Sequence, residues 1–131
     1  MKKLAFVVLG CLLVPSCASG PAIPKDAVFL GERTVPFAGD HDVLQVGGDA
    51  GRFSSLFFVV EKNDIELYDM VVTYGNGVKK KFDTRLNCSA DSRSRRLQLD
   101  GKRFIKTIAF TYKTVGSWLD GRARVVVYGL G

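Results

Sequence analysis

The sequence predicts an all-β fold, an antiparallel two-sheet β-sandwich with a jelly-roll-like topology and about eight strands. Short runs of β-branched and aromatic residues follow one another from residue 28 onward, with turn residues about every eight to twelve positions. No run of useful length has the 3.6-residue hydrophobic period of a helix. The chain of 131 residues is 47% hydrophobic and 24% charged, which is typical of one globular domain. A closed barrel is the alternative architecture.

Two strands are expected at the start of the domain. Residues 28–37 form the first strand, which ends near Pro36 and the Gly39-Asp40 turn. Residues 42–46 form a short alternating strand. The glycine-rich segment 47–51 follows it as a loop.

Two longer strands form the centre of the expected sheets. Residues 53–61 (FSSLFFVVE) are the most apolar run, and we expect both faces of this strand to be buried. Residues 65–74 (IELYDMVVTY) form the next strand. Its hydrophobic alternation slips near Asp69, which indicates a β-bulge or a bend between sheets.

A hairpin is the strongest local signal in the chain. Asn76-Gly77 lies between two β-type runs and predicts a two-residue turn, because both residues tolerate a positive φ. Residues 78–84 (VKKKFDT) form the return strand, whose three consecutive lysines suit an exposed edge. Residues 86–96 are expected to form a polar loop.

Three strands are expected to complete the domain. Residues 97–99 alternate and stop at an Asp100-Gly101 turn, and residues 104–112 and 124–128 close the sheets. Residues 115–121 form the last loop. The predicted core consists of Leu30, Val35, Val43, Val46, Phe53, Leu56, Phe58, Val60, Leu67, Val71, Leu97, Leu99, Ile105, Ile108, Phe110, Val125 and Val127.

Residues 1–18 are expected to be a secretory signal peptide. A basic start precedes an apolar run at residues 4–14, which is too short to span about 30 Å of hydrocarbon. The segment Val14-Pro15-Ser16-Cys17 resembles the recognition box of bacterial lipoproteins, so Cys17 is the candidate lipidation site. Ordinary cleavage after Ala18 is the alternative.

The mature chain is then expected to hold a flexible tether at residues 19–27 and the β-sandwich domain at residues 28–131. Cys11 leaves with the signal, and Cys17 is lipidated or removed. Cys88 is therefore expected to be the only thiol of the domain, without an intramolecular disulfide. It either packs as a small residue or serves as a reactive or interchain thiol.

Catalytic and metal sites are poorly supported by the composition. One histidine and three cysteines exclude a zinc ribbon, a haem site and a disulfide-dense scaffold. No sequence motif supports Cys88 and His41 as a nucleophile and its general base. Asp40 and Asp42 are expected to be solvated carboxylates of a turn. With Asp49 these carboxylates bracket a glycine-rich loop, but their spacing matches no calcium-loop motif. We expect no catalytic residue, metal or cofactor.

Charge is distributed unevenly along the chain, whose formal net charge is +6. From Cys17 onward, 17 Lys and Arg stand against 13 Asp and Glu, a net charge of +4. Residues 18–78 hold four bases against nine acids, whereas residues 79–113 hold eleven bases against three acids. Such a cluster either attracts polyanions or consists of solvated outward residues. The predicted binding residues are Lys79, Lys80, Lys81, Arg85, Arg93, Arg95, Arg96 and Arg103.

The single tryptophan offers another recognition site. Trp118 lies in a loop with Gly116, Ser117 and Asp120. Beside Tyr68 or Tyr112, an exposed indole there would stack on a sugar ring. The alternative is that Trp118 folds over the end of the sandwich as an apolar cap.

Turn and core motifs recur across residues 28–129. They are Leu30-Gly31-x-Arg33-Thr34-Val35, Asp42-x-Leu44-x-Val46-Gly47, Gly51-x-Phe53, Tyr74-Gly75-Asn76-Gly77, Arg103-Phe104-Ile105, Phe110-Thr111-Tyr112 and Gly121-Arg122-Ala123. This ordered set resembles a family of small uncharacterised bacterial secreted all-β proteins, a domain of unknown function. The resemblance implies an envelope protein and carries over no catalytic residues; a more distant likeness is to jelly-roll sugar-binding modules.

The sequence therefore predicts an exported, non-catalytic cell-envelope protein, either periplasmic or an outer-membrane lipoprotein. Its expected partner is an anionic envelope polymer or membrane face, such as lipopolysaccharide, acidic phospholipid, teichoic acid or an acidic glycan. Nucleic acid is not expected, because the protein is exported and lacks a recognition motif. The alternative function is carbohydrate binding or interaction with another envelope protein through aromatic residues near Trp118.

Overall fold

The computed structural model describes residues 18–19, 23–82 and 85–131, so Cys17 and nearly all of the expected signal peptide lie outside it. Every strand pairing in this part is antiparallel, and the all-β prediction is confirmed. None of the described helices is long and apolar enough to cross a membrane. The strands are β1 (Ala18–Ser19), β2 (Val28–Val35), β3 (Asp40–Gln45), β4 (Arg52–Glu61), β5 (Ile65–Tyr74), β6 (Lys79–Phe82), β7 (Leu86–Cys88), β8 (Ser92–Arg93), β9 (Leu97–Thr114) and β10 (Ala123–Leu130).

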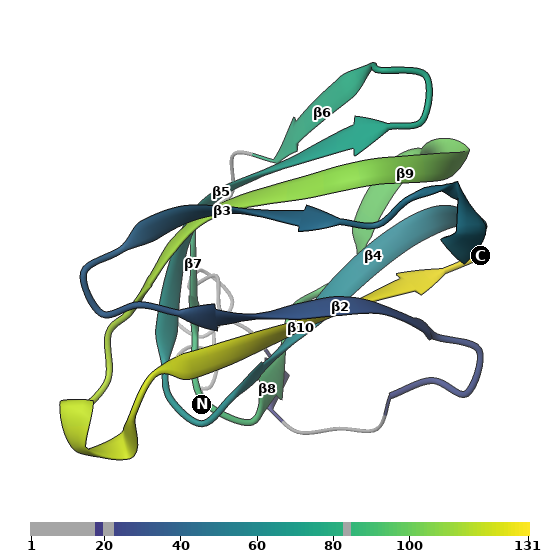
Figure 1. The fold of residues 1–131 in the computed structure, drawn as a ribbon. Helices are drawn as coiled ribbons and strands as arrows, with labels where there is room; N and C mark the ends of the chain where they lie inside the picture. The colour runs from purple at the N-terminus through teal and green to yellow at the C-terminus, as the bar shows by residue number, and fades with distance from the viewer. Residues whose placement is uncertain (1–17, 20–22, 83–84) are drawn as a thin grey trace, which may run out of the picture.

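Two layers of strands face each other, and β9 belongs to both (Figure 1). Residues 97–104 of β9 pair with β4, which continues through β10 to β2. Residues 105–114 of β9 lie between β3 and β5, and β5 also pairs with β6 and β7. The predicted sandwich is thus one continuous antiparallel sheet that curls over on itself.

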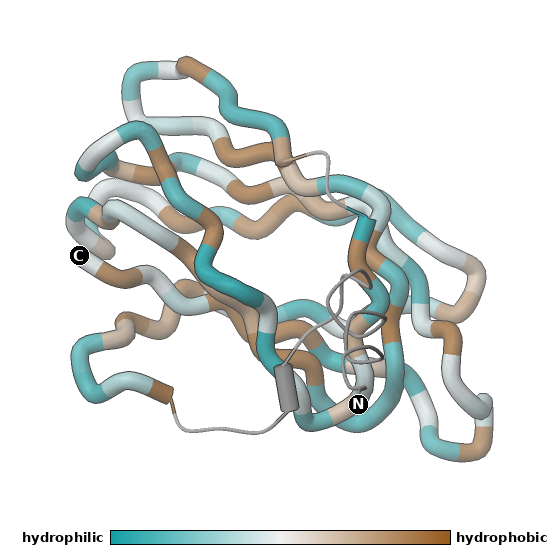
Figure 2. Tube along the Cα trace, turned by 180° about the vertical axis from the view of Figure 1, so that it is seen from behind, coloured by the Kyte–Doolittle hydropathy of each residue, from teal (hydrophilic) through white to brown (hydrophobic). Residues whose placement is uncertain are grey.

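Hydrophobic side chains of both layers fill the space between them. Figure 2 shows hydrophilic and hydrophobic residues alternating along the strands, as expected where one strand face is buried. In β4, Leu56, Phe57 and Phe58 are all buried, so the prediction of a central strand with two buried faces is confirmed. Each such side chain contributes roughly 1.5–3 kcal/mol by leaving water.

The predicted irregularity near Asp69 is confirmed as a shift in the β5–β9 register between Leu67 and Asp69. After this bulge, Met70 and Val72 point into the core, and Val71 is only partly buried. The prediction of Val71 as a core residue is therefore wrong. The prediction of Val43 as a core residue is also wrong, because Val43 is 38% exposed and its neighbour Leu44 packs inward instead.

The β5–β6 hairpin is confirmed, but its turn has three residues instead of two. The Gly77 N–H donates to the Tyr74 carbonyl at 2.9 Å, and the Tyr74 N–H donates to the Val78 carbonyl at 2.8 Å. Only Gly77 has a positive φ, of 91°, within this turn. A three-residue loop with glycine in the left-handed region closes the hairpin, and the Asn76 carboxamide accepts the Val78 N–H.

Two predictions between residues 86 and 112 are wrong. The expected polar loop at 86–96 contains the short strands β7 and β8. The expected turn at Asp100-Gly101 is a bend within β9, which continues unbroken for 18 residues. Gly101 has a φ of 84°, so the chain changes direction there without leaving the sheet.

The described N-terminal residues join the sheet. Ala18 and Ser19 pair with Arg93 and Ser92 of β8. Close to this edge, Cys88 is 1% exposed and disulfide-bonded. The prediction of Cys88 as a lone thiol without an intramolecular disulfide is therefore wrong.

Candidate functional site

The β5–β6 turn and the bend of β9 lie at the same end of the curled sheet (Figure 1). Residues of both line a pocket of about 220 Å³. A second pocket of about 410 Å³ adjoins it and shares Gly75 and Phe104 as lining residues. Gly47, Gly48, Ile105 and Lys106 also line the second pocket. We call the lining residues of the first pocket the basic pocket: Arg52, Tyr74, Gly75, Asn76, Lys102, Arg103 and Phe104.

The close approach of Gly75 to Phe104 shapes the basic pocket. The Gly75 N–H donates to the Phe104 carbonyl at 2.8 Å, which ties the hairpin turn to β9. A Cβ atom on Gly75 would lie 3.1 Å from the Phe104 Cβ, so glycine allows this approach. The Phe104 ring is 47% exposed and forms an apolar wall beside the bases.

Tyr74, Asp100 and Lys80 form a hydrogen-bonded network behind the pocket. The Tyr74 hydroxyl donates to Asp100 Oδ2 at 3.1 Å, and Lys80 Nζ lies 3.2 Å from Oδ1 of the same carboxylate. The hydrogen bonds from Lys80 and Tyr74 hold the pKa of Asp100 below its ordinary value. Burial raises the pKa of the Tyr74 hydroxyl, so it remains a proton donor at neutral pH.

Two arginines of the basic pocket lie over aromatic rings. The Arg103 guanidinium is 5.0 Å from the Tyr74 ring centre, and its Nε donates to the Asp100 carbonyl at 2.7 Å. The Arg52 guanidinium is 5.7 Å from the centre of Phe104, its partner in the β4–β9 register. Cation–π contact orients each guanidinium without neutralising its charge.

The lining of both pockets, as far as the structure describes it, contains no carboxylate. Asp100 is the acidic neighbour, and Lys80 balances it. Neither Arg52 nor Lys102 forms an ion pair within the described part of the chain. The pocket therefore combines uncompensated positive charge with an exposed aromatic wall, an arrangement that suits a phosphorylated or carboxylated ligand.

The structure brings two of the predicted bases, Lys80 and Arg103, to this site. Lys80 lies opposite buried Val72 in the β5–β6 register and thus on the inner side of β6. Lys79 and Lys81 alternate with it and point to the other side.

The remaining predicted bases lie apart from the pocket. Arg85 stacks on Tyr68 at 4.7 Å, and Arg93 on β8 lies 5.9 Å from the Phe57 ring. β8 and β6 occupy opposite flanks of the sheet order, with β4, β9 and β5 between them. Arg95 and Arg96 follow β8 after Ser94, on the same flank, so the predicted set does not form one continuous surface.

Sequence reasoning missed Arg52 and Lys102 as site residues. Arg52 belongs to the acid-rich part of the sequence, and only the pairing of β4 with β9 brings it to Phe104. Lys102 lies in the basic segment, directly after the Asp100-Gly101 bend. The sequence signal that could have identified Lys102 is its position directly after a glycine, where a strand can bend.

Trp118 lies in a second exposed feature, the loop with the short helix η3 (Trp118–Asp120), at the opposite end of the molecule (Figure 1). Trp118 and Leu119 are both 75% exposed, which rules out the alternative of an apolar cap. Tyr112 is completely buried and offers no ring beside the indole. Asn63 is 3% exposed and donates to the carbonyls of Ser117 and Gly121 at 2.7 and 2.8 Å, so it fixes the loop.

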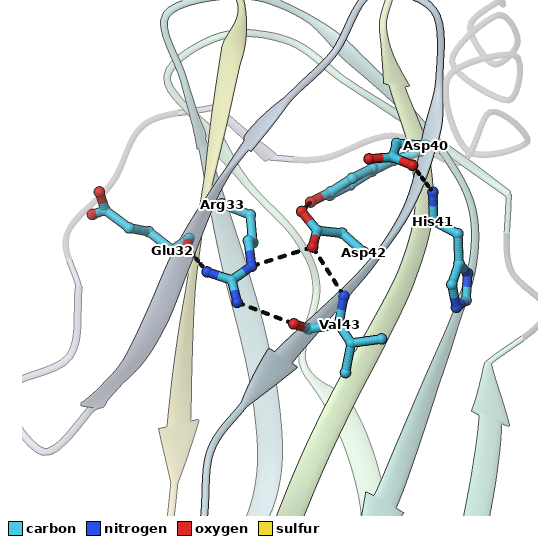
Figure 3. A network of polar contacts seen from close by, with 7 residues as sticks. Glu32, Arg33, Asp40, His41, Asp42 and Val43 are labelled. Carbon is cyan, nitrogen blue, oxygen red and sulfur yellow. Dashed lines mark hydrogen bonds and ion pairs between the residues drawn. The ribbon is translucent and has the colours of Figure 1, made fainter.

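The carboxylates near residue 41 are engaged in structural contacts (Figure 3). Asp42 lies 3.4 Å from Arg33 Nε and accepts the Tyr112 hydroxyl at 3.2 Å, while Asp40 accepts the His41 N–H at 2.8 Å. Burial and the Asp42 carboxylate raise the pKa of Tyr112 strongly. Within the described residues, no three His, Cys, Asp or Glu side chains lie together as a metal site would require. Asp49 therefore belongs to no such group.

Cys88 and His41 do not form a catalytic pair. His41 is exposed on β3, and its Nδ1 lies 3.1 Å from Thr111 Oγ1. Cys88 is buried on β7 and its sulfur is already bonded. A disulfide sulfur has no thiolate to act as a nucleophile.

Comparison with known proteins gives one match. A family model described as "Domain of unknown function (DUF2541)" matches residues 5–129, nearly the whole chain and all strands up to Gly129 of β10. No curated protein and no solved structure matches this chain.

Proposed function

The chain belongs to the DUF2541 family, a domain of unknown function, and we propose that it is a non-catalytic cell-envelope module that binds an anionic polymer. The observation that carries the proposal is the basic pocket. Arg52, Lys102 and Arg103 line it together with the exposed Phe104 ring, and the described lining contains no carboxylate.

A phosphorylated glycan is the ligand class that suits this chemistry best. Guanidinium groups bind phosphate through two parallel N–H groups, and here two of them are already oriented by the Tyr74 and Phe104 rings. The exposed Phe104 ring offers a stacking face for a sugar. Lipopolysaccharide carries both groups, and a phospholipid face carries the phosphate alone.

Export is the second part of the proposal. A basic start, an apolar run of eleven residues and a small-residue segment form the pattern of a secretory leader at residues 1–18. The leader permits a lipid-anchored form at Cys17 or a free periplasmic form. Both place the basic pocket among anionic envelope polymers.

Retention of the purified chain on immobilised lipopolysaccharide tests the proposal. The bound protein is expected to elute as the salt concentration rises, because salt screens the attraction between exposed charges. Flow-through at low salt, or elution independent of salt, would contradict the proposal.

Trp118 supports a second candidate function, the binding of a neutral glycan or of another envelope protein. Its support is the 75% exposure of Trp118 and Leu119 on a loop that Asn63 holds in place. Trp118→Ala is expected to abolish such binding on a glycan array while the fold is retained. Unchanged binding by this variant would contradict the second candidate.

A further inference from the structure

The second pocket is the feature at this end of the molecule to which the proposed function assigns no role. It has a volume of about 410 Å³ and shares Gly75 and Phe104 with the basic pocket. We propose that the two pockets are adjoining subsites for one sugar unit that carries a phosphate on each side. The inference rests on the proposed function and narrows its ligand class.

The Phe104 side chain is the wall that the two pockets have in common, and it is 47% exposed. The Arg52 guanidinium lies 5.7 Å from the centre of this ring and lines the basic pocket, but Arg52 does not line the second pocket. The second pocket therefore offers the part of the ring that Arg52 leaves uncovered. A sugar stacks there, and its first phosphate lies in the basic pocket.

A lysine lies on each side of this ring along β9. Lys102, Phe104 and Lys106 are alternate residues of the strand and are all exposed, whereas Ile105, between the last two, is completely buried. Side chains two positions apart on a strand share a face and lie roughly 7 Å apart. A sugar unit on Phe104 therefore has Lys102 of the basic pocket on one side and Lys106 of the second pocket on the other.

A β-bulge presents Lys106 at the second pocket. Thr73 and Tyr74 are adjacent on β5, but their partners on β9 are two positions apart, so Lys106 is the extra residue. A bulge beside a binding site re-aims a side chain. The Lys106 carbonyl accepts the N–H groups of Val46 and Gly47 at 3.0 and 3.3 Å, which holds the bulge against the 47–51 loop. Lys106 forms no ion pair with any other described residue, so its charge is available to the second phosphate.

Glycines complete the second pocket. Gly47, Gly48 and Gly75 line it without side chains, so peptide N–H and carbonyl groups form part of its wall. Such backbone groups bond polar atoms of a ligand and fix its orientation. An aromatic face, peptide groups and one cation together suit a sugar ring with an anionic substituent.

Calorimetric titration of the purified protein with glucose 1,6-bisphosphate, glucose 1-phosphate and glucose 6-phosphate tests the inference. The bisphosphate is expected to bind about fivefold more tightly than either monophosphate, which is the gain from one exposed phosphate–lysine contact. Lys106→Gln should remove this preference and leave the affinity for the monophosphates unchanged. Lys62→Gln is the matched control, since Lys62 is exposed and lies at the opposite end of β4 from Arg52, and it should keep the preference.

Gly48→Leu tests the second pocket by filling it. A Cβ atom on Gly48 would meet no other atom within 4 Å, and the φ of Gly48 lies outside the left-handed region, so a side chain is accommodated without strain. The variant is expected to bind the three sugar phosphates about tenfold more weakly and to bind inorganic phosphate as wild type does. Wild-type affinity of Gly48→Leu for the sugar phosphates would overturn the inference.

Two further results would also overturn it. They are equal affinity of the wild-type protein for the bisphosphate and the monophosphates, and a preference for the bisphosphate that Lys106→Gln retains. Because Lys106 is exposed, this variant gives a readout that does not depend on packing at position 48. If salt-dependent retention on lipopolysaccharide persists, the inference alone has failed. Loss of that retention together with no binding of any probe would contradict the proposed function as well.

Discussion

Tyr74 and Asp100 exchange two hydrogen bonds behind the basic pocket. The Tyr74 hydroxyl donates to Asp100 Oδ2 at 3.1 Å and accepts the Asp100 N–H at 3.2 Å. These two hydrogen bonds join the end of β5 to the bend of β9. The same two residues also hold Arg103, since the Asp100 carbonyl accepts its Nε and the Tyr74 ring lies against its guanidinium. The geometry of the pocket thus depends on a buried phenol and an exposed carboxylate.

The carboxylate of Asp100 should titrate below its ordinary pKa of 3.8 in the folded protein. A carboxyl with a lowered folded pKa stabilises the fold above its unfolded pKa, and this stability is lost as the pH falls through the folded pKa. A carbon-13 NMR titration of the carboxyl measures the midpoint directly. We expect Lys80→Gln to raise it, and a wild-type midpoint at or above 3.8 would contradict this account.

Tyr74→Phe should lower the free energy of unfolding by about 1 kcal/mol, because it removes one hydroxyl from a part-buried hydrogen-bonded pair. Urea denaturation measures the change. Tyr68→Phe is the matched control, since the Tyr68 hydroxyl bonds to Glu66 away from the pocket. Salt-dependent retention on lipopolysaccharide should weaken for Tyr74→Phe alone. Equal retention by both variants would contradict the role of the Tyr74 hydroxyl in holding Asp100, whose carbonyl accepts the Arg103 Nε.

The strands with clear periodicity were predictable from sequence, and the short paired strands were not. β5 has the predicted bounds and the predicted bulge near Asp69. β7 and β8 have three and two residues, too few for any hydrophobic period to appear. Their strand character comes from backbone pairing with β5 and β4, which depends on the tertiary fold.

Gly101 illustrates a different limit of sequence reasoning. Asp-Gly is typical of a turn, and Gly101 does adopt a positive φ of 84°. β9 pairs with β4 on both sides of the bend and with β5 from Ile105 onward, which keeps the chain in the sheet, so the local signal marks a bend. This bend also brings Lys102 and Arg103 to Arg52, a grouping that charge counts along the sequence could not reveal.

Asn63→Ala should lower the free energy of unfolding by about 1–3 kcal/mol, because it breaks three part-buried hydrogen bonds, to the Ser117 and Gly121 carbonyls and the Asp64 N–H. Equilibrium denaturation checks the magnitude, and Asn87→Ala, at an exposed site of β7, is the control. Limited proteolysis should cut the loop around Trp118 faster in Asn63→Ala. Equal stability of the two variants would show that Asn63 does not hold the loop.

The tryptophan fluorescence of the protein should report the exposure of Trp118, since it is the single tryptophan of the chain. We expect red-shifted emission and efficient acrylamide quenching, because the residue is 75% exposed. Trp118→Ala should change the free energy of unfolding by less than about 0.5 kcal/mol. Blue-shifted, poorly quenched emission would mean that the indole is buried in solution.

The central claim is that the basic pocket, rather than the net charge of the chain, binds an anionic envelope polymer. Its most direct test is a calorimetric titration of two charge-matched triple variants with a soluble phosphorylated oligosaccharide from lipopolysaccharide. Arg52→Gln/Lys102→Gln/Arg103→Gln alters the pocket, and Lys79→Gln/Arg85→Gln/Arg96→Gln removes three exposed charges elsewhere. We expect the pocket variant to bind about tenfold more weakly or worse, and the control within about twofold of wild type. Equal weakening of both variants, or wild-type binding by the pocket variant, would contradict the claim.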